Sequence, residues 1–283
     1  MNTADFGYAL LQGDFEQAEK ILIDCIPSKL IKYIALFDEP KESKRNQKRF
    51  ESLKNEELWI SSIHSLNDPF EFKSAYIDWD WYDKHDFPSD LIKKFQESID
   101  YSEEYGVTCL SDCSNMYNIP MWSYYTNNHR GFCIEYEVVR KKHIKKVFYE
   151  QNRIDVTRLL LQLYEEFKKH PHFSNQEDAM EYFATHLKEM ERERQIGLLL
   201  FYSMFMKSTQ WEHEKEYRVL YDEINKNISL QSVGLKTRRI IGGYGCSSGH
   251  MSILNKISNN LGCGNAYQMV LDDKTFAIHD IRI

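Results

Sequence analysis

The segment 211–220 carries a row of charged side chains that could do chemistry. It reads WEHEKEYRVL, and if it is extended, a period of two places these residues on one side: Glu212, Glu214, Glu216 and Arg218. A carboxylate in such a row can accept a hydrogen bond from a sugar hydroxyl and stabilise positive charge on a sugar carbon. A solvated strand edge that resists pairing would have the same sequence. Spacing alone leaves both interpretations open.

An aromatic segment, MWSYYTNNHRG at 121–131, precedes a strand predicted over 131–138. On a helix Trp122, Tyr125 and His129 are spaced i, i+3 and i+7 and share one face. That face could stack on a flat ring, or it could pack in the core, as aromatic stripes at helical spacing usually do.

A third group of polar residues follows a strand predicted over 58–63. Ser61 and Ser62 are near its end, and the turn SLNDPFE at 65–71 contains Asn67 and Asp68. Loops of this kind often carry ligand contacts, but Asn and Asp also bind their own backbone in turns. We expect no metal site, because the six cysteines form no CxxC pair and the HEKE at 213–216 is not the HExxH motif.

Composition limits the class of protein. The 283 residues include 36 Lys and Arg against 43 Asp and Glu, a net charge of −7, so no global positive field collects nucleic acid nonspecifically. The start of the chain does not resemble a secretory signal, and the longest apolar run, 196–206, is shorter than the roughly 20 residues that span a bilayer. With its cysteines scattered, the chain is predicted to be cytoplasmic, with reduced thiols and no membrane contact.

The elements that position these residues predict an α+β fold. We expect a helical hairpin over 1–27, then one domain over 28–283 with a helical insertion at about 155–207 that could act as a lid. The other predicted helices cover 41–57, 120–127 and 248–261. The predicted strands are 30–36, 58–63, 106–111, 131–138, 217–221, 228–233, 238–244, 267–271 and 276–283. The dinucleotide motif GxGxxG and the phosphate-binding loop GxxxxGK[ST] are both absent.

Three motifs together indicate a family. They are SLNDPFE at 65–71, MWSYYTNNHRGFCIEY at 121–136 and KSTQWEHEKEYRVL at 207–220. In this order they resemble an uncharacterised bacterial family, a domain of unknown function with LYKYR, FNDPFE, MWSHYAxxHxG and WxxExEYR motifs. Lys32-Tyr33 would be its Lys-Tyr pair. Leu66 stands where Phe is usual in that family and Tyr124 where His is usual.

A looser resemblance is to the ADP-ribosyltransferases of the bacterial toxin and nucleic-acid-modifying kind, whose catalytic strand carries an ExE motif. It implies small mixed or antiparallel sheets, and NAD as the substrate. Glu216 would hold the nicotinamide ribose hydroxyl and Glu214 would assist the acceptor. The residues that would bind NAD are Lys32, Tyr33, Ser61, Asn67, Asp68, Trp122, Tyr125, His129 and Arg218.

This resemblance predicts a glycosyl transfer in which ADP-ribose passes to a nucleic acid or protein, as in a toxin or a phage-defence effector. With water as the acceptor the protein would be an NAD hydrolase. One alternative is a noncatalytic module that binds a ligand or, through its N-terminal helices, a protein partner. Another is a metal-dependent nuclease that uses Asp68, Glu71 and Glu216.

Overall fold

The computed structural model describes residues 5–6, 8–9, 12–99, 105–168, 198 and 205–283. The chain divides into two compact units, each assembled from three segments. Unit 1 comprises 1–25, 63–104 and 147–211, and unit 2 comprises 26–62, 105–146 and 212–283. Much of the predicted helical insertion, and part of the predicted helical hairpin over 1–27, lies outside the described residues.

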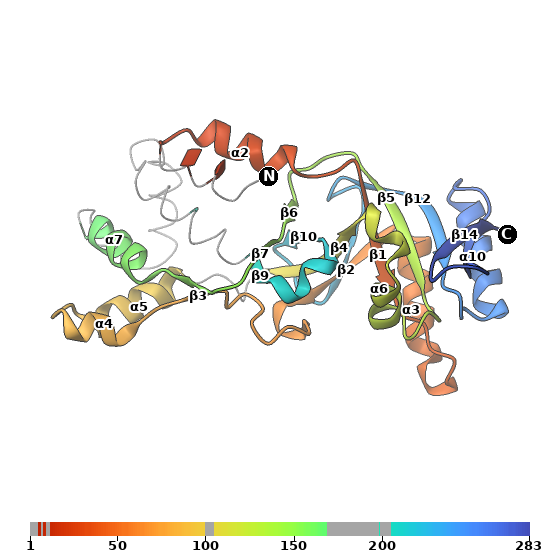
Figure 1. The fold of residues 1–283 in the computed structure, drawn as a ribbon, viewed down its shortest axis with the longest axis horizontal. Coiled ribbons are helices and arrows are strands. Elements are labelled where there is room, and N and C mark those ends of the chain that lie inside the picture. Colours follow the sequence, from red (N-terminus) through yellow and green to blue (C-terminus); the bar gives the residue numbers. More distant parts are fainter. Residues whose placement is uncertain (1–4, 7, 10–11, 100–104, 169–197, 199–204) are drawn as a thin grey trace. The chain divides into compact units, whose positions relative to one another are not determined.

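Unit 2 is built on a ten-stranded sheet (Figure 1). Its strands are β1 (Lys29–Ile34), β2 (Glu57–Ser62), β4 (Gly106–Asp112), β5 (Phe132–Val138), β6 (Ile144–Lys146), β10 (Glu216–Tyr221), β11 (Lys226–Ser229), β12 (Leu235–Gly242), β13 (Tyr267–Leu271) and β14 (Ile278–Arg282). The order is β11-β2-β4-β1-β5-β12-β13-β14, with β10 paired to β4 and β6 paired to β10. Only the β12–β13 pair is parallel among these strands. The predicted α+β class with a mixed sheet is confirmed.

The sheet is larger than the small sheets that we predicted, because β4 joins strands on both of its edges. β10 pairs along the whole of one edge. The other edge is shared, with Ser111 and Asp112 of β4 opposite β1 and Gly106 and Val107 opposite β2. Sequence patterns within single strands do not reveal that one strand has three partners.

Helices cover both faces of this sheet. On one face lie α3 (Ser43–Lys54) and α10 (Ser248–Asn260), and the ring of Phe50 in α3 stacks on Phe132 of β5 at 6.3 Å between centroids. On the other lie the 3-10 helix η4 (Cys113–Tyr117) and α6 (Ile119–Tyr125). Trp122 of α6 packs with Cys133, the neighbour of Phe132, and successive residues of a strand point to opposite faces. A further 3-10 helix, η1 (Pro40–Glu42), precedes α3.

The helix α6 is too short to place Trp122, Tyr125 and His129 on one helical face. Asn118 caps its start by accepting a hydrogen bond from the backbone N–H of Met121 at 3.3 Å. The helix ends at Tyr125, and residues 127–129 have φ values of 53°, 54° and 65°, which lie in the left-handed region. His129 therefore lies in a turn, and the prediction that it shares a helical face with Trp122 and Tyr125 is wrong.

Gly131 and Gly243 allow this turn to lie against neighbouring backbone. The N–H of Gly243 donates to the carbonyl of Gly131 at 2.8 Å, and the N–H of Gly245 donates to the carbonyl of His129 at 2.9 Å. A Cβ atom on Gly131 would lie 2.0 Å from the carbonyl oxygen of Ile34, and one on Gly243 would lie 2.1 Å from that of His129.

We expect Gly131→Ala to lower the free energy of unfolding by about 1–3 kcal/mol, because the methyl group has no room beside the backbone of β1. Gly249→Ala is the matched control, since a Cβ at Gly249 meets nothing within 4 Å and the residue is helical. Its effect should be neutral or stabilising. Urea unfolding of both variants measures the difference, and equal stabilities would refute the close approach at Gly131.

Unit 1 contains α2 (Phe15–Asp24), α4 (Trp79–Lys84), α5 (Ser89–Ile99) and α7 (Thr157–Phe167), and the 3-10 helices η2 (Ile63–Ser65) and η5 (Thr209–Glu214), of which η5 continues into unit 2. Two short parallel pairs join β3 (Ala75–Tyr76) to β8 (Ile154–Asp155) and β7 (Phe148–Glu150) to β9 (Met206–Ser208). Asp14 caps α2 by accepting from the N–H of Gln17 at 3.0 Å. One of its cores gathers Tyr82, Ile92 and Leu160.

Candidate functional site

The charged segment 211–220 is not one extended strand. Residues up to Glu214 belong to η5, Lys215 has a φ of 45°, and β10 begins only at Glu216. The predicted single face of four charged side chains is therefore wrong, and only Glu216 and Arg218 keep the alternation.

Residues 213–214 do not extend the strand because side chains, and not a neighbouring strand, donate hydrogen bonds to their carbonyls. The side-chain amide of Asn115 donates to the carbonyls of His213 at 2.7 Å and of Glu214 at 2.8 Å. The hydroxyl of Ser111 also donates to the carbonyl of Glu214. These bonds stabilise the 3-10 geometry ahead of β10, because the carbonyls need no strand partner.

Glu216 and Arg218 form a buried ion pair on β10. They are 3% and 0% exposed. The guanidinium Nε donates to Oε1 at 2.8 Å and Nη2 donates to Oε2 at 3.2 Å, a two-point contact. Cys109 of β4 lies opposite Arg218, and burial together with the charge of Glu216 raises the pKa of its thiol well above the usual range. A thiol with a raised pKa is a poorer nucleophile at neutral pH.

Glu214 lies beside the aromatic residues of α6 and β1. It is 4% exposed and accepts a hydrogen bond from the hydroxyl of Tyr125. The hydroxyl of Tyr33 donates to the backbone carbonyl of Asn115, whose side chain holds the Glu214 backbone. Asn115 therefore connects the first strand to the ExE segment. Sequence reasoning missed this residue, which lies three residues beyond the end of β4, although asparagines in turns often make such contacts.

Lys32 points to the opposite face of the sheet from Tyr33. Its ammonium donates to the hydroxyl of Thr108 at 2.6 Å and to the carbonyl of Cys109 at 3.1 Å. Burial lowers the pKa of Lys32, although Cys109 and Glu216 act in the other direction. The predicted Lys-Tyr pair is thus divided between the two faces, as expected for neighbours on a strand.

Trp122 is a core residue, which is one of the two interpretations that its spacing left open. The indole is 0% exposed, its Nε1 donates to the carbonyl of Met116 at 2.7 Å, and its ring meets that of Tyr33 edge-on at 5.3 Å. A fully buried ring has no free face on which a ligand could stack.

Ser61 and His129 are not brought to the carboxylates. Ser61 pairs with Val107, whereas Glu216 pairs with Ser111, four residues further along β4, a distance of about 13 Å. His129 places its Nε2 at 2.9 Å from the hydroxyl of Ser123, and burial lowers its pKa. It contributes to the turn that follows α6.

Asn67 and Asp68 belong to unit 1. Asp68 is buried and its Oδ1 accepts from the N–H of Phe70 at 2.9 Å, which is the local turn contact that the sequence left as an alternative. Nearby in the motif, Glu71 forms a buried ion pair with Lys207 at 3.8 Å. The ammonium of Lys207 lies 4.9 Å from the ring centroid of Trp211. The first and third motifs therefore meet in unit 1.

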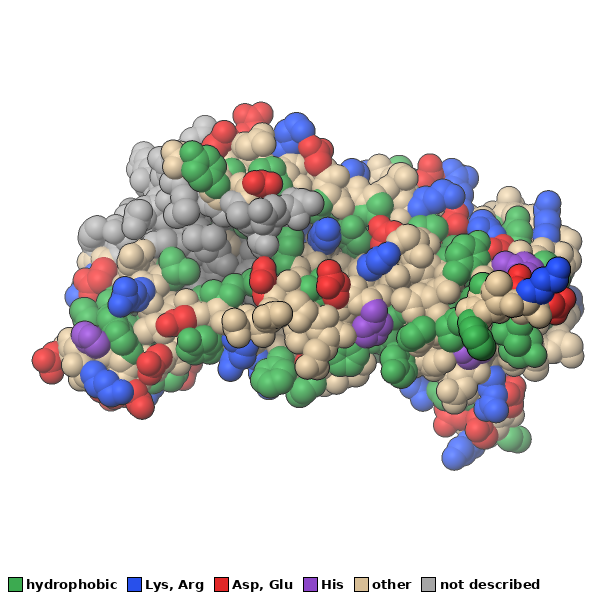
Figure 2. All heavy atoms as spheres, viewed as in Figure 1, with side chains coloured by type: hydrophobic (Ala, Val, Ile, Leu, Met, Phe, Trp, Pro, Cys, Tyr) green, Lys and Arg blue, Asp and Glu red, His purple; other side chains and the backbone are tan. Residues whose placement is uncertain are grey.

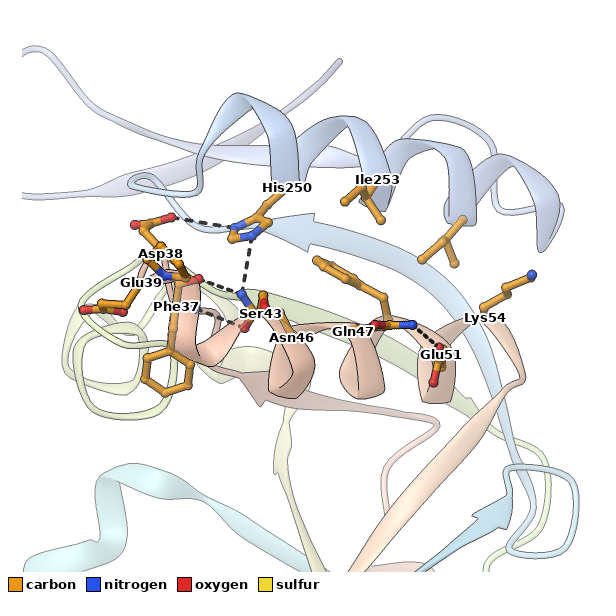
Figure 3. A pocket seen from close by; sticks show the side chains of 13 residues that line it. Phe37, Asp38, Glu39, Ser43, Asn46, Gln47, Glu51, Lys54, His250 and Ile253 are labelled. Carbon is orange, nitrogen blue, oxygen red and sulfur yellow. Dashed lines mark hydrogen bonds and ion pairs between the residues drawn. The ribbon is translucent and has the colours of Figure 1, made fainter.

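A cleft of about 490 Å³ lies in unit 2 between α3 and α10, away from the predicted residues (Figure 3). Its polar end contains Asp38, Asn46 and His250, none of which we predicted as site residues. One signal was present in the sequence, since Asn46, Phe50 and Leu53 follow helical spacing within a charged segment and indicate a covered face.

Within the described part of the chain, no group of three His, Cys, Asp or Glu side chains could hold a metal ion. None of the helices described there is long and apolar enough to cross a membrane. On the face shown in Figure 2, basic and acidic side chains are interspersed, and neither sign forms a large patch.

The fold and the site define an α+β protein with two buried carboxylates, Glu214 and Glu216, that are separated in the sequence by Lys215. Residues 121–219 match the model of a family described as "Protein of unknown function (DUF2971)". The prediction of an uncharacterised family of unknown function is thereby confirmed over this segment. No curated protein and no solved structure matches the chain. The resemblance to ADP-ribosyltransferases stays a prediction.

Proposed function

We propose that the chain is an NAD-dependent ADP-ribosyltransferase that transfers ADP-ribose to a nucleic acid or protein. One observation carries the proposal. Four separate segments meet around Glu214 and Glu216. Tyr125 of α6 and Arg218 of β10 bind the two carboxylates. Asn115 of η4 binds the backbone carbonyl of Glu214, and Tyr33 of β1 binds the backbone carbonyl of Asn115.

In the proposed reaction the bond between C1′ of the ribose and the nicotinamide nitrogen breaks, and nicotinamide leaves with the bonding electron pair. Positive charge develops on C1′ and is stabilised by the carboxylate of Glu216. The acceptor atom bonds to C1′ and gives its proton to Glu214, which Tyr125 orients. Arg218 orients Glu216 and offsets its charge before the substrate binds. Since both carboxylates are buried, NAD reaches them only if the side chains that cover them move.

A noncatalytic binding module is the second candidate, and two observations favour it. Both carboxylates already have protein partners, in Arg218 and Tyr125. The cleft between α3 and α10 is lined by none of the predicted residues. In such a module the ion pair would be structural and the cleft would hold the ligand.

The test incubates purified protein with NAD labelled on the adenylate, alone and with DNA, RNA or cell extract. Free nicotinamide and transferred label are both measured. We expect nicotinamide release to fall by about a hundredfold or more in Glu216→Gln, because a developing charge loses its carboxylate. Glu212→Gln is the matched control, since Glu212 is an exposed carboxylate of the same segment. Label on a polymer identifies the acceptor, whereas release without transfer indicates NAD hydrolysis.

If the folded wild-type protein neither binds nor cleaves NAD, the transferase proposal is overturned and the binding module is favoured. Because Glu216→Gln weakens a buried pair, its thermal unfolding is measured alongside. Tyr125→Phe is a second variant that removes one hydrogen bond to Glu214 without touching the ion pair.

A further inference from the structure

The cleft between α3 and α10 has the form of a small-molecule site. Its volume of about 490 Å³ is within the usual range for such sites. Apolar walls come from both helices, with Phe50 on α3 and Ile253 and Ile257 on α10. Figure 3 shows His250 and Ile253 of α10 facing Asn46 and Gln47 of α3 across this space.

The hydrogen bonds of Asn46 favour one tautomer of His250. Asn46 is buried; its Oδ1 accepts from the N–H of Phe37 at 3.1 Å, and its Nδ2 donates to the carbonyl of Phe37 at 2.6 Å. The other hydrogen of Nδ2 is available to His250 Nε2, which lies 3.5 Å away. A neutral imidazole that accepts at Nε2 carries its proton on Nδ1.

That proton has no acceptor among the described residues. His250 Nδ1 is buried without a hydrogen-bond partner there. The nearest carboxylate oxygen is Oδ1 of Asp38, at 3.9 Å, which is too far for a direct hydrogen bond (Figure 3). The other oxygen of Asp38 faces the guanidinium of Arg130 at 3.8 Å. His250 Nδ1 and Asp38 Oδ1 are therefore close enough to share one bridging group, which reaches the buried Nδ1 only if the side chains that cover it move.

A group that bridges these two atoms must accept from Nδ1–H and donate to the carboxylate. A hydroxyl does both, whereas an ammonium has no lone pair and a carboxylate or phosphate would repel Asp38. The charges of the lining also disfavour an anion, because Asp38, Glu39 and Glu51 outnumber the single Lys54.

We propose that this cleft binds an uncharged nucleoside. A ribose hydroxyl bridges Asp38 and His250, and the flat base packs between Phe50 and the isoleucines of α10. This site is separate from the carboxylates, and the inference rests on the cleft alone and not on the proposed transferase activity.

Calorimetric titration of the purified protein with adenosine tests the proposal. We expect saturable binding that weakens by about tenfold or more with 2′,3′-dideoxyadenosine, because the bridging hydroxyl is lost. AMP should bind more weakly than adenosine, since it places a phosphate among carboxylates. Asp38→Ala and His250→Phe should each lose about tenfold or more in adenosine affinity. Glu39→Gln is the control and should change the affinity less than twofold, because Glu39 lines the cleft but does not face Nδ1.

No saturable binding of adenosine, equal affinities for adenosine and its dideoxy analogue, or an unchanged affinity in Asp38→Ala would each overturn the proposal. Tighter binding of a blocked lysine amide than of adenosine would overturn it as well, since the acidic lining would then select cations. Adenosine binding and nicotinamide release are measured in separate experiments on the wild type, so failure of the transferase proposal and failure of this one are distinguishable.

Discussion

Replacing Arg218 by methionine is expected to lower the free energy of unfolding by about 3–5 kcal/mol. Arg218 is 0% exposed, and its two contacts to Glu216 are hydrogen bonds between charged groups. Methionine fills much of the same volume but leaves the buried carboxylate of Glu216 without its counter-charge. The cost comes from that uncompensated charge rather than from lost packing.

A double-mutant cycle in urea unfolding measures this effect. Glu216→Leu combined with Arg218→Met should recover most of the lost stability, because no charge then remains buried. Arg238→Met is the matched control: Arg238 lies on β12 and pairs with Glu137, but the two side chains are 45% and 40% exposed. Its cost should be below about 1 kcal/mol. A similarly small cost at Arg218 would show that the ion pair is not buried in solution.

The second large effect is expected at Trp122, where substitution by alanine should cost about 3–5 kcal/mol. The indole is fully buried with Ile31, Cys133 and Ile241, and it meets Tyr33 edge-on. Alanine leaves a cavity on this face of the sheet. It also removes the donor to the carbonyl of Met116.

Tyr124→Ala provides the control two residues further along the same helix, because Tyr124 is 69% exposed. It should change stability by no more than about 0.5 kcal/mol. Both variants are compared by urea unfolding, monitored by far-UV circular dichroism so that the signal does not depend on the removed tryptophan. Comparable effects at the two positions would contradict the placement of Trp122 in the core, and would restore it as a candidate stacking residue.

Sequence periodicity predicted the elements well where local pattern and packing agree. The strands predicted over 217–221 and 267–271 are β10 and β13, and the helix predicted over 248–261 is α10. The strand predicted over 228–233 is correct only at its start, because β11 ends at Ser229 and residues 230–234 form a turn. Apolar residues in that turn, such as Leu230 and Val233, are buried without being extended. Hydrophobicity reports burial, and it does not distinguish a buried turn from a strand.

The charged segment and the aromatic segment show the opposite case, in which distant residues override local spacing. Glu214 departs from the strand because Asn115 and Ser111, about one hundred residues earlier in the chain, bind its carbonyl. His129 leaves the helical face because the turn at 127–129 packs against the glycines of 243–245. Such partners are invisible to a window of neighbouring residues.

By itself, the sequence determined the α+β class, most of the strands and helices, and the resemblance to a family of unknown function that the match over residues 121–219 supports, because these depend on periodicity and on ordered motifs. Only the tertiary structure decided that Trp122 is core and that Glu216 is paired with Arg218. It also divided Lys32 from Tyr33 and placed His250 opposite Asp38. Each of these depends on which atoms lie within a few ångströms of one another across long separations in the chain, and residue spacing along the sequence carries no such information.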